Sequence, residues 1–305
     1  MKLEFPPNWK VERHASALLL FHGTVYYVRH AATNRIVRWN SRDHRKGKMA
    51  RIVKPGSIAK VRFGYKFIQF TNISWWTSIL FIVGSIFWLI NGVYIYHMPL
   101  FNEQDNMDTG AYFGLLGGLT FLVGGYCMFL EALNVDKRQI LYHHQMLLEQ
   151  GQIEEIGEWR WYGCGDFRDL GFTAAVLQFI GTIIFGIGPI TGLPNVLPDP
   201  TDNPNIWIIL YWLPQVVGAT FLILSSYCIM IEVQTKFYKI RPISLGWHVG
   251  FWNILGSVGF FISGFVGFYL PDVNDPLFID GVALSTYVGS YCFLFGSMLQ
   301  YVELI

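Results

Sequence analysis

Residues 245–270 read LGWHVGFWNILGSVGFFISGFVGFYL, and residues 281–304 read GVALSTYVGSYCFLFGSMLQYVEL. Each stretch is apolar and long enough to cross a bilayer as a helix, since about 20 residues at 1.5 Å rise span the hydrocarbon core. A short acidic turn joins the two, and the second ends at a carboxylate, Glu303. This pair of stretches predicts a membrane-spanning helical hairpin.

The same pattern occurs three times in the chain. The first helices, aligned on a glycine, read FIVGSIFWLING, QFIGTIIFGIGP and NILGSVGFFISG. The second helices, aligned on a glutamate, read FLVGGYCMFLEA, LILSSYCIMIEV and FLFGSMLQYVEL. The aligned residues are Gly84, Gly181 and Gly256, and Glu131, Glu232 and Glu303. Glycine and glutamate are 47, 51 and 47 residues apart. The sequence therefore predicts three hairpin repeats, near 74–133, 170–233 and 245–304.

Composition points to a membrane protein. The 305 residues are 52% hydrophobic and only 14% charged, against about 25% charged in soluble domains. The predicted spans are 74–96, 109–131, 173–192, 206–231, 247–270 and 281–302. The alternation of a β-barrel is missing, so the spans should be helices. We expect an all-α fold, a polytopic membrane protein whose membrane domain covers 74–305 with six transmembrane helices in three repeated hairpins.

Charge is distributed unevenly along the chain. Residues 1–74 hold 15 of the 22 Lys and Arg residues and three acids, and the other basic residues follow spans two and four. The connections after spans one, three and five contain no Lys or Arg. Basic residues mark the cytoplasmic side of membrane proteins. We therefore expect both termini in the cytosol, with 1–73 forming a basic cytosolic N-terminal segment.

The basic N-terminal segment contains two short runs with strand-like composition. Thr24–Val28 is expected to pair with a neighbour such as Arg35–Trp39, whereas the apolar run 15–28 is too short to span a membrane. The basic run that follows suggests a charge anchor that fixes topology, or a surface for anionic lipid headgroups. The candidate lipid-binding residues are Arg42, Arg45, Lys46, Lys48, Arg51 and Lys54. Nucleic-acid binding is not expected, because no pattern of stacking aromatics accompanies these charges.

Polar side chains inside predicted spans are costly and therefore informative. Gln178 and Asn253 occupy one aligned position, which suggests an interhelical hydrogen bond, and Gln300 lies in the last span. The three aligned glutamates end the second helices. Packed around a threefold axis, they would form a carboxylate ring at the cytosolic mouth that attracts cations. In the alternative interpretation they mark helix ends and pair with nearby bases, namely Lys137, Arg138, Lys236 or Lys239.

The cysteines predict no disulfide and no metal site. Cys127, Cys228 and Cys292 lie inside predicted spans, and Cys164 lies in a cytosolic connection where thiols stay reduced. Their spacing fits no zinc pattern. We expect no cofactor.

The three-hairpin pattern resembles YrhK-like membrane proteins. The resemblance rests on G-[ST]-x-x-[WF] in the first helix and a Gly or Ser pair before the terminal glutamate in the second. It covers roughly 75–303, and the stretch YWLPQVVGATFLILSSYCIMIE is similar to multi-span fungal membrane proteins with that domain. The resemblance implies an architecture but no chemistry and no functional residue.

Together these patterns predict a non-enzymatic integral membrane protein that organises or stabilises a membrane through packing and contact with the lipid bilayer. The alternative is a channel or transporter with a path between the hairpins. An enzyme is not expected, because no catalytic motif occurs in the chain.

Overall fold

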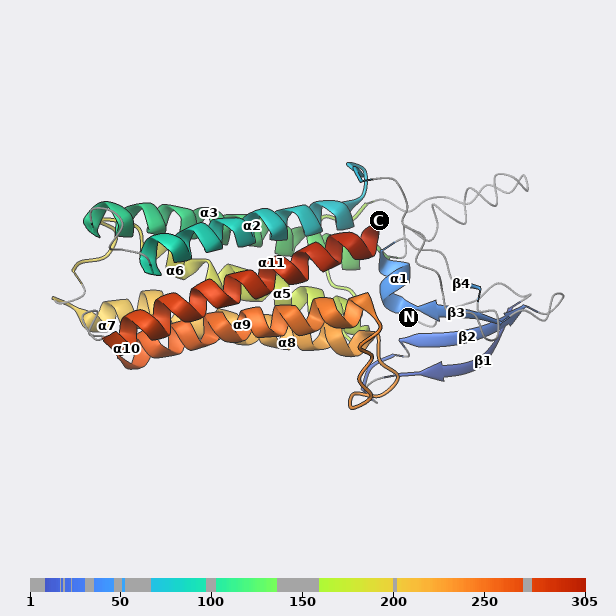
Figure 1. Cartoon of the computed structure of the whole chain (residues 1–305). Coiled ribbons are helices and arrows are strands. Elements are labelled where there is room, and N and C mark those ends of the chain that lie inside the picture. Colours follow the sequence, from blue (N-terminus) through green and yellow to red (C-terminus); the bar gives the residue numbers. More distant parts are fainter. Residues whose placement is uncertain are drawn as a thin grey trace.

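The computed structural model has a long helical bundle with a small β-sheet at one end (Figure 1). It describes residues 9–16, 18, 20–22, 24–30, 36–46, 51–52, 67–96, 103–135, 159–199, 202–270 and 276–305. The C-terminus lies at the end of the bundle that carries the sheet. This end is called the sheet end below.

Within the described residues, six helical spans are long and apolar enough to cross a membrane. They cover Ile73–Tyr96, Met107–Leu133, Leu170–Thr191, Pro204–Glu232, Leu245–Tyr269 and Pro276–Leu304. Their elements are α2 (Ile73–Tyr96), α3 (Glu103–Leu133), α5 (Leu170–Phe185), α6 (Ile187–Thr191), α7 (Pro204–Trp207), η2 (Ile208–Trp212), α8 (Leu213–Glu232), α9 (Leu245–Tyr269), α10 (Pro276–Ile279), η3 (Asp280–Leu284) and α11 (Ser285–Leu304). The prediction of six spans is confirmed, and this is the architecture of a multi-pass integral membrane protein.

Polar side chains define where two of the helices begin at the sheet end. The Asn72 Oδ1 accepts a hydrogen bond from the backbone N of Ser74 at 3.1 Å, and Asp169 Oδ1 accepts one from Gly171 N at 2.7 Å. Each satisfies a backbone donor that has no partner within its helix. The apolar runs that follow then continue as helices, because lipid leaves backbone groups no other partner.

The six spans pack as a closed ring. Neighbours in the chain are neighbours in space, from α2 through α3, α5, α8 and α9 to α11, and α11 packs back against α2. Glycines permit close approach of the backbones. A Cβ on Gly181 would lie 3.2 Å from the carbonyl O of Gly218, and one on Gly289 would lie 2.9 Å from the carbonyl O of Gly256. Small residues at such crossings are a general packing device in membranes.

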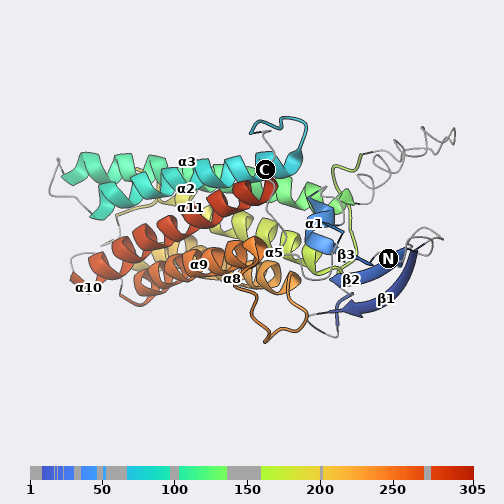
Figure 2. The same cartoon turned by 45° about the vertical axis from the view of Figure 1, so that its right-hand side comes forward.

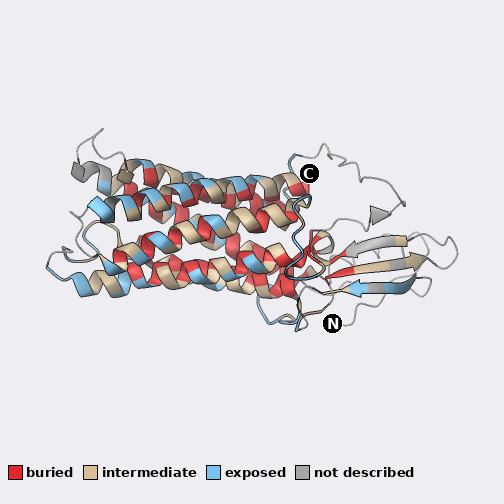
Figure 3. Ribbon diagram, turned by 60° about the horizontal axis from the view of Figure 1, so that its bottom comes forward, coloured by how far each residue is buried: buried red, intermediate tan, exposed pale blue. Residues whose placement is uncertain are grey.

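Three aromatic rings meet at the centre of this bundle, from α2, α5 and α9. The Trp88 ring centroid lies 5.5 Å from that of Phe185 and 5.1 Å from that of Phe260, and the two phenylalanine centroids are 5.2 Å apart. Edge-to-face contacts of this kind stabilise beyond simple burial. Phe121 and Phe293 extend the cluster toward the sheet end. Buried positions accordingly follow the inside of the bundle over its length (Figure 3).

The N-terminal segment forms a four-stranded antiparallel sheet in the order β1-β2-β3-β4. The strands are β1 (Trp9–Ala15), β2 (Val25–His30), β3 (Ile36–Asn40) and β4 (Arg51–Ile52). Tyr26 of β2 pairs with Trp39 of β3, so the predicted pairing of these two runs is confirmed. A short helix, α1 (Ser41–Arg45), follows β3 directly.

The prediction of an all-α fold is therefore wrong for the N-terminal segment, although the chain is mostly helical. Composition over the whole chain is dominated by the membrane spans, and strands of two to seven residues contribute little to it. Strands β1 and β4, which the sequence analysis did not predict, depend on pairing contacts that local composition does not reveal.

Candidate functional site: a buried ion-pair cluster

Helix α1 lies between the sheet and the end of the bundle (Figures 1 and 2). Two hydrogen bonds fix its start: Asn40 Oδ1 accepts from Arg42 N at 3.0 Å, and Ser41 N donates to the Thr24 carbonyl at 3.0 Å. Arg42 and Arg45 are three positions apart and therefore project from one side of this short helix. Both side chains reach the ends of the membrane spans.

Arg45 binds the carboxylate at the end of α8. Its Nη1 and Nη2 donate to Glu232 Oε1 and Oε2 at 2.7 and 2.8 Å, and Ser41 Oγ donates to Glu232 Oε1 at 3.0 Å. Arg45 Nε also lies 3.6 Å from Glu131 Oε1, at the end of α3. Planar two-point pairing of this kind is the strongest form of an arginine–carboxylate bond.

Arg42 makes the equivalent contact with the carboxylate near the end of α11. Its Nε and Nη2 donate to Glu303 Oε1 and Oε2 at 2.9 and 2.8 Å. Lys46 Nζ lies 2.8 Å from Glu303 Oε2. Arg42 Nη1 lies 3.9 Å from Glu232 Oε2, so the two pairs join into one cluster.

The cluster is buried and electrically balanced. Its three glutamates and three basic residues are each between 0% and 7% exposed. Removing such charges from water is expensive, and their mutual pairing offsets the cost only with good geometry. Burial acts to lower the pKa of Arg45, but the Glu232 carboxylate outweighs it, so that pKa is raised. Burial lowers the pKa of Lys46, and Glu303 offsets this only in part.

Two glycines make room for the arginine–glutamate pairs. A Cβ on Gly171, in the first turn of α5, would overlap Arg45 Nη1 and lie 2.8 Å from Glu232 Oε1. A Cβ on Gly246, in the first turn of α9, would lie 2.8 Å from Arg42 Nε and 2.9 Å from Glu303 Oε1. Each pair is thus held between the start of one span and the end of another.

The structure brings together the three glutamates that the sequence analysis aligned, but it gives them unexpected partners. Among the described residues, their basic partners are Arg42 and Arg45 of α1 and Lys46 directly after it. Lys137 and Arg138 lie outside the described residues, and Lys236 is instead 5.6 Å from the ring centroid of Tyr238. The cause is the docking of α1, a tertiary contact across about 190 to 260 residues of sequence.

The candidate lipid-binding residues divide into two groups. Arg42, Arg45 and Lys46 face buried carboxylates within the protein, so their side chains are not available to lipid headgroups. Lys48 and Lys54 lie outside the described residues, as does the side chain of Arg51. For these three, binding of anionic lipid stays a prediction.

The three amide side chains predicted inside the spans, Gln178, Asn253 and Gln300, are not part of the cluster. Gln178 and Gln300 are buried, at 6% and 7% exposed. Asn253 faces α11, where its Oδ1 would contact a Cβ on Gly296. Among the described residues this oxygen is buried without a hydrogen-bond partner, so it does not form the expected interhelical hydrogen bond.

The chemistry available to the cluster is ion pairing. Among the described residues, no group of three or more His, Cys, Asp or Glu is arranged to hold a metal ion. The sequence signal that could have revealed the cluster is the spacing of Arg42, Arg45 and Lys46, which places three bases on one short segment opposite three aligned glutamates.

Comparisons of the chain with protein-family models, with curated proteins and with solved structures find no match. The resemblance to YrhK-like membrane proteins therefore stays a prediction from the sequence.

Substituting Arg45 should strongly destabilise the protein. Arg45→Met leaves Glu232 buried without its partner, which should lower the free energy of unfolding by about 3–5 kcal/mol. The double variant Arg45→Met/Glu232→Leu should recover part of this loss, because the charge of Glu232 is removed as well, whereas Glu131 still lacks Arg45. Unfolding of the purified protein in detergent measures both effects.

The matched control is the half-exposed pair of Glu12 with Arg29 in the sheet. Glu12→Gln should cost no more than about 1 kcal/mol, because water screens an exposed pair. Equal losses for Arg45→Met and Glu12→Gln would contradict a structural role for the buried cluster.

Proposed function

We propose that this protein is a non-enzymatic structural protein of the membrane, whose closed six-helix bundle holds the basic N-terminal domain against one membrane face. The observation that carries this proposal is the pairing of the three buried glutamates with Arg42 and Arg45 of α1. These contacts attach the sheet to the bundle by charges that neither part could bury alone. The protein then organises the membrane through packing and lipid contact.

The proposal favours a closed bundle over a channel. A carboxylate ring attracts permeant cations only while its charge is free, whereas the protein's own bases neutralise this one. Further along the axis, Trp88, Phe185 and Phe260 fill the centre with aromatic rings. Both features oppose the passage of ions between the hairpins.

In this proposal, the bundle is built from three repeats of a two-helix hairpin. Residues at equivalent positions lie in equivalent contacts, which supports this view. In each hairpin, one glycine of the first helix lies against one glycine of the second, so that a Cβ on one of them would approach the carbonyl oxygen of the other. The pairs are Gly84–Gly117, Gly181–Gly218 and Gly256–Gly289. The central aromatic rings likewise come one from each hairpin. A repeat of this kind would explain why three glutamates converge at one end.

The orientation that fits this function places both termini and the sheet in the cytosol. The basic residues of the N-terminal segment and of the connections after spans two and four favour that side. The exposed Cys164 lies in one of these connections. The acidic connections would then lie on the opposite side of the membrane.

If the two glycine sites are equivalent, Gly171→Ala and Gly246→Ala should destabilise the protein to similar extents. Each methyl group would displace an arginine from its glutamate, so we expect losses of roughly 2–4 kcal/mol, the range for breaking a buried ion pair. Gly110→Ala on α3 is the control, because the added Cβ overlaps no atom: it would lie 3.3 Å from Ile95 Cγ1, 3.5 Å from Tyr94 Cβ and 3.7 Å from the Asn91 carbonyl O. A large loss at one site and none at the other, measured by unfolding in detergent, would argue against equivalent repeats.

If the bundle is closed, the purified protein in liposomes should pass neither K⁺ nor Na⁺ above the rate of empty liposomes. Entrapped ion-sensitive dyes measure this directly. The triple variant Glu131→Gln/Glu232→Gln/Glu303→Gln is the control for the ring. Ion flux in the original protein that disappears in this variant would establish the channel interpretation and overturn the proposal.

Thiol labelling tests the orientation. In sealed vesicles of known sidedness, a membrane-impermeant reagent should modify Cys164 from the cytosolic side only. Cys127 and Cys228, one turn before Glu131 and Glu232, should stay unmodified because the bundle is dry there. Modification of Cys164 from the other side would contradict the orientation, and reaction at Cys127 or Cys228 would contradict a closed bundle.

A further inference from the structure

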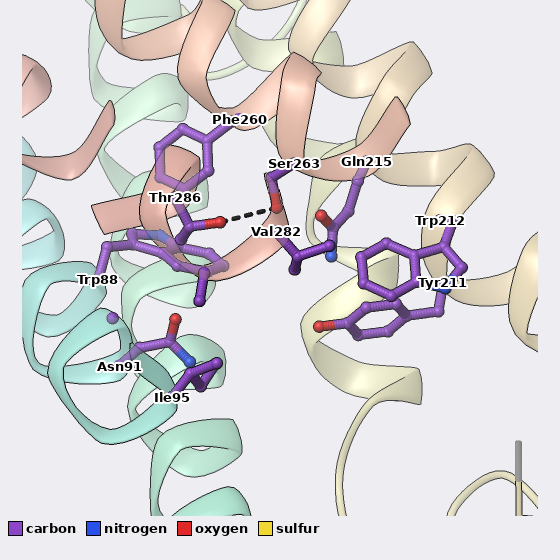
Figure 4. A pocket seen from close by; sticks show the side chains of 12 residues that line it. Trp88, Asn91, Ile95, Tyr211, Trp212, Gln215, Phe260, Ser263, Val282 and Thr286 are labelled. Atoms are coloured by element: carbon purple, nitrogen blue, oxygen red, sulfur yellow. Dashed lines mark hydrogen bonds between the residues drawn. The ribbon is translucent and has the colours of Figure 1, made fainter. Parts of the chain in front are cut away.

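A small cavity lies inside the bundle, and its lining residues belong to the half away from the sheet. Figure 4 shows it from close by. Its volume is about 20 Å³, and its walls come from α2, η2, α8, α9, η3 and α11. A cavity needs roughly 10–15 Å³ of such space to hold one water molecule. The cavity therefore has room for a molecule of about that size.

Polar groups from four parts of the chain converge on this space. The Asn91 carbonyl oxygen, the Tyr211 hydroxyl and the Gln215 amide point toward it, as Figure 4 shows. Thr286 Oγ1 donates to Ser263 Oγ at 2.8 Å beside it. Asn91 Nδ2 donates to the Gly110 carbonyl at 2.8 Å, which fixes the amide so that its oxygen faces the cavity. The lining thus offers both hydrogen-bond donors and acceptors.

Two π-helical turns of the backbone border the cavity. The π-helical turns η2 and η3 contribute Tyr211 and Trp212 from one side and Val282 and Ala283 from the other. Such turns are rare, and they occur frequently at functional sites because they interrupt the regular hydrogen-bond ladder and redirect side chains. Two of them border the same cavity.

The cavity has an uncharged lining and is closed at one end by aromatic rings, and these two features limit what it can bind. None of the described residues that line it is an Asp, Glu, Lys, Arg or His, and an unpaired ion at this depth would be costly. Toward the sheet end, Trp88 and Phe260 close the space together with Phe185. The space is a pocket with an aromatic floor, and it does not continue to the ion-pair cluster.

From this arrangement we propose that the cavity is a binding site for a small uncharged hydrogen-bonding molecule of the size of water, bound between Asn91, Tyr211 and Gln215. The bound molecule forms hydrogen bonds with Asn91 of the first pair of spans and with Tyr211 and Gln215 of the second, beside the Thr286–Ser263 hydrogen bond of the third pair. It links these helices through hydrogen bonds on the side of the aromatic rings opposite the ion-pair cluster.

Radiolytic footprinting of the full-length protein in lipid nanodiscs tests the proposal, with water as the probe. X-ray pulses convert bound water into hydroxyl radicals that oxidise adjacent side chains, and mass spectrometry locates the products. Phe260 lines the cavity and Phe121 does not, although they are 1% and 2% exposed. We expect oxidation of Phe260 well above that of Phe121, and oxidation of Trp88 above that of the similarly buried Trp75.

Two variants sharpen the test. Ala283→Leu fills the cavity from η3 and should reduce oxidation of Phe260 to the level of Phe121. Ala111→Leu makes the same change on α3, away from the cavity, and should leave Phe260 oxidation unchanged. Oxidation of the buried Phe121 that stays low reports that each variant is folded, because unfolding would expose this side chain.

The outcome in the original protein decides the proposal even if Ala283→Leu does not fold. If Phe260 is oxidised no more than Phe121, and Trp88 no more than Trp75, the cavity is dry and the proposed binding site is overturned. Oxidation of Phe260 that persists in a folded Ala283→Leu variant would also overturn it, because the water would then lie elsewhere.

Discussion

The structure depends on charges that are buried where the helical bundle meets the N-terminal sheet. Glu131, Glu232 and Glu303 would each be unstable at this depth without a partner, because the desolvation of a carboxylate costs several kcal/mol. Arg42 and Arg45 provide the partners from a helix of five residues. The bundle and the sheet are therefore energetically dependent on each other, even though each has secondary structure of its own.

This dependence explains features that have little meaning when viewed separately. Gly171 and Gly246 stand where a side chain would collide with an arginine, and Asn40 fixes the start of α1 so that both arginines point inward. The sheet gives α1 a rigid support, since β3 leads into it without an intervening loop. A buried ion-pair cluster is stable only when its charged groups are placed accurately. Gly171, Gly246 and Asn40 allow this placement.

Along the axis, the interior changes from charged to aromatic to polar. The ion pairs lie at the sheet end, the rings of Trp88, Phe185 and Phe260 fill the middle, and a small polar cavity follows beyond them. Aromatic packing keeps the two polar regions apart. This order opposes a continuous path for ions, in agreement with the closed bundle that we propose, and it places the small polar cavity in the half of the bundle away from the sheet.

The sequence alone was sufficient for the six spans, because about 20 consecutive apolar residues have only one way to satisfy their backbone in lipid. It also aligned Glu131, Glu232 and Glu303, which the structure brings together, and it predicted the pairing of β2 with β3. It did not identify the partners of these glutamates, because Arg42 and Arg45 lie far from them in the chain and only the docking of α1 brings them together. The cavity between Asn91, Tyr211 and Gln215 likewise belongs to the tertiary structure alone, because its walls come from spans that are separated in sequence and its size depends on how those spans pack.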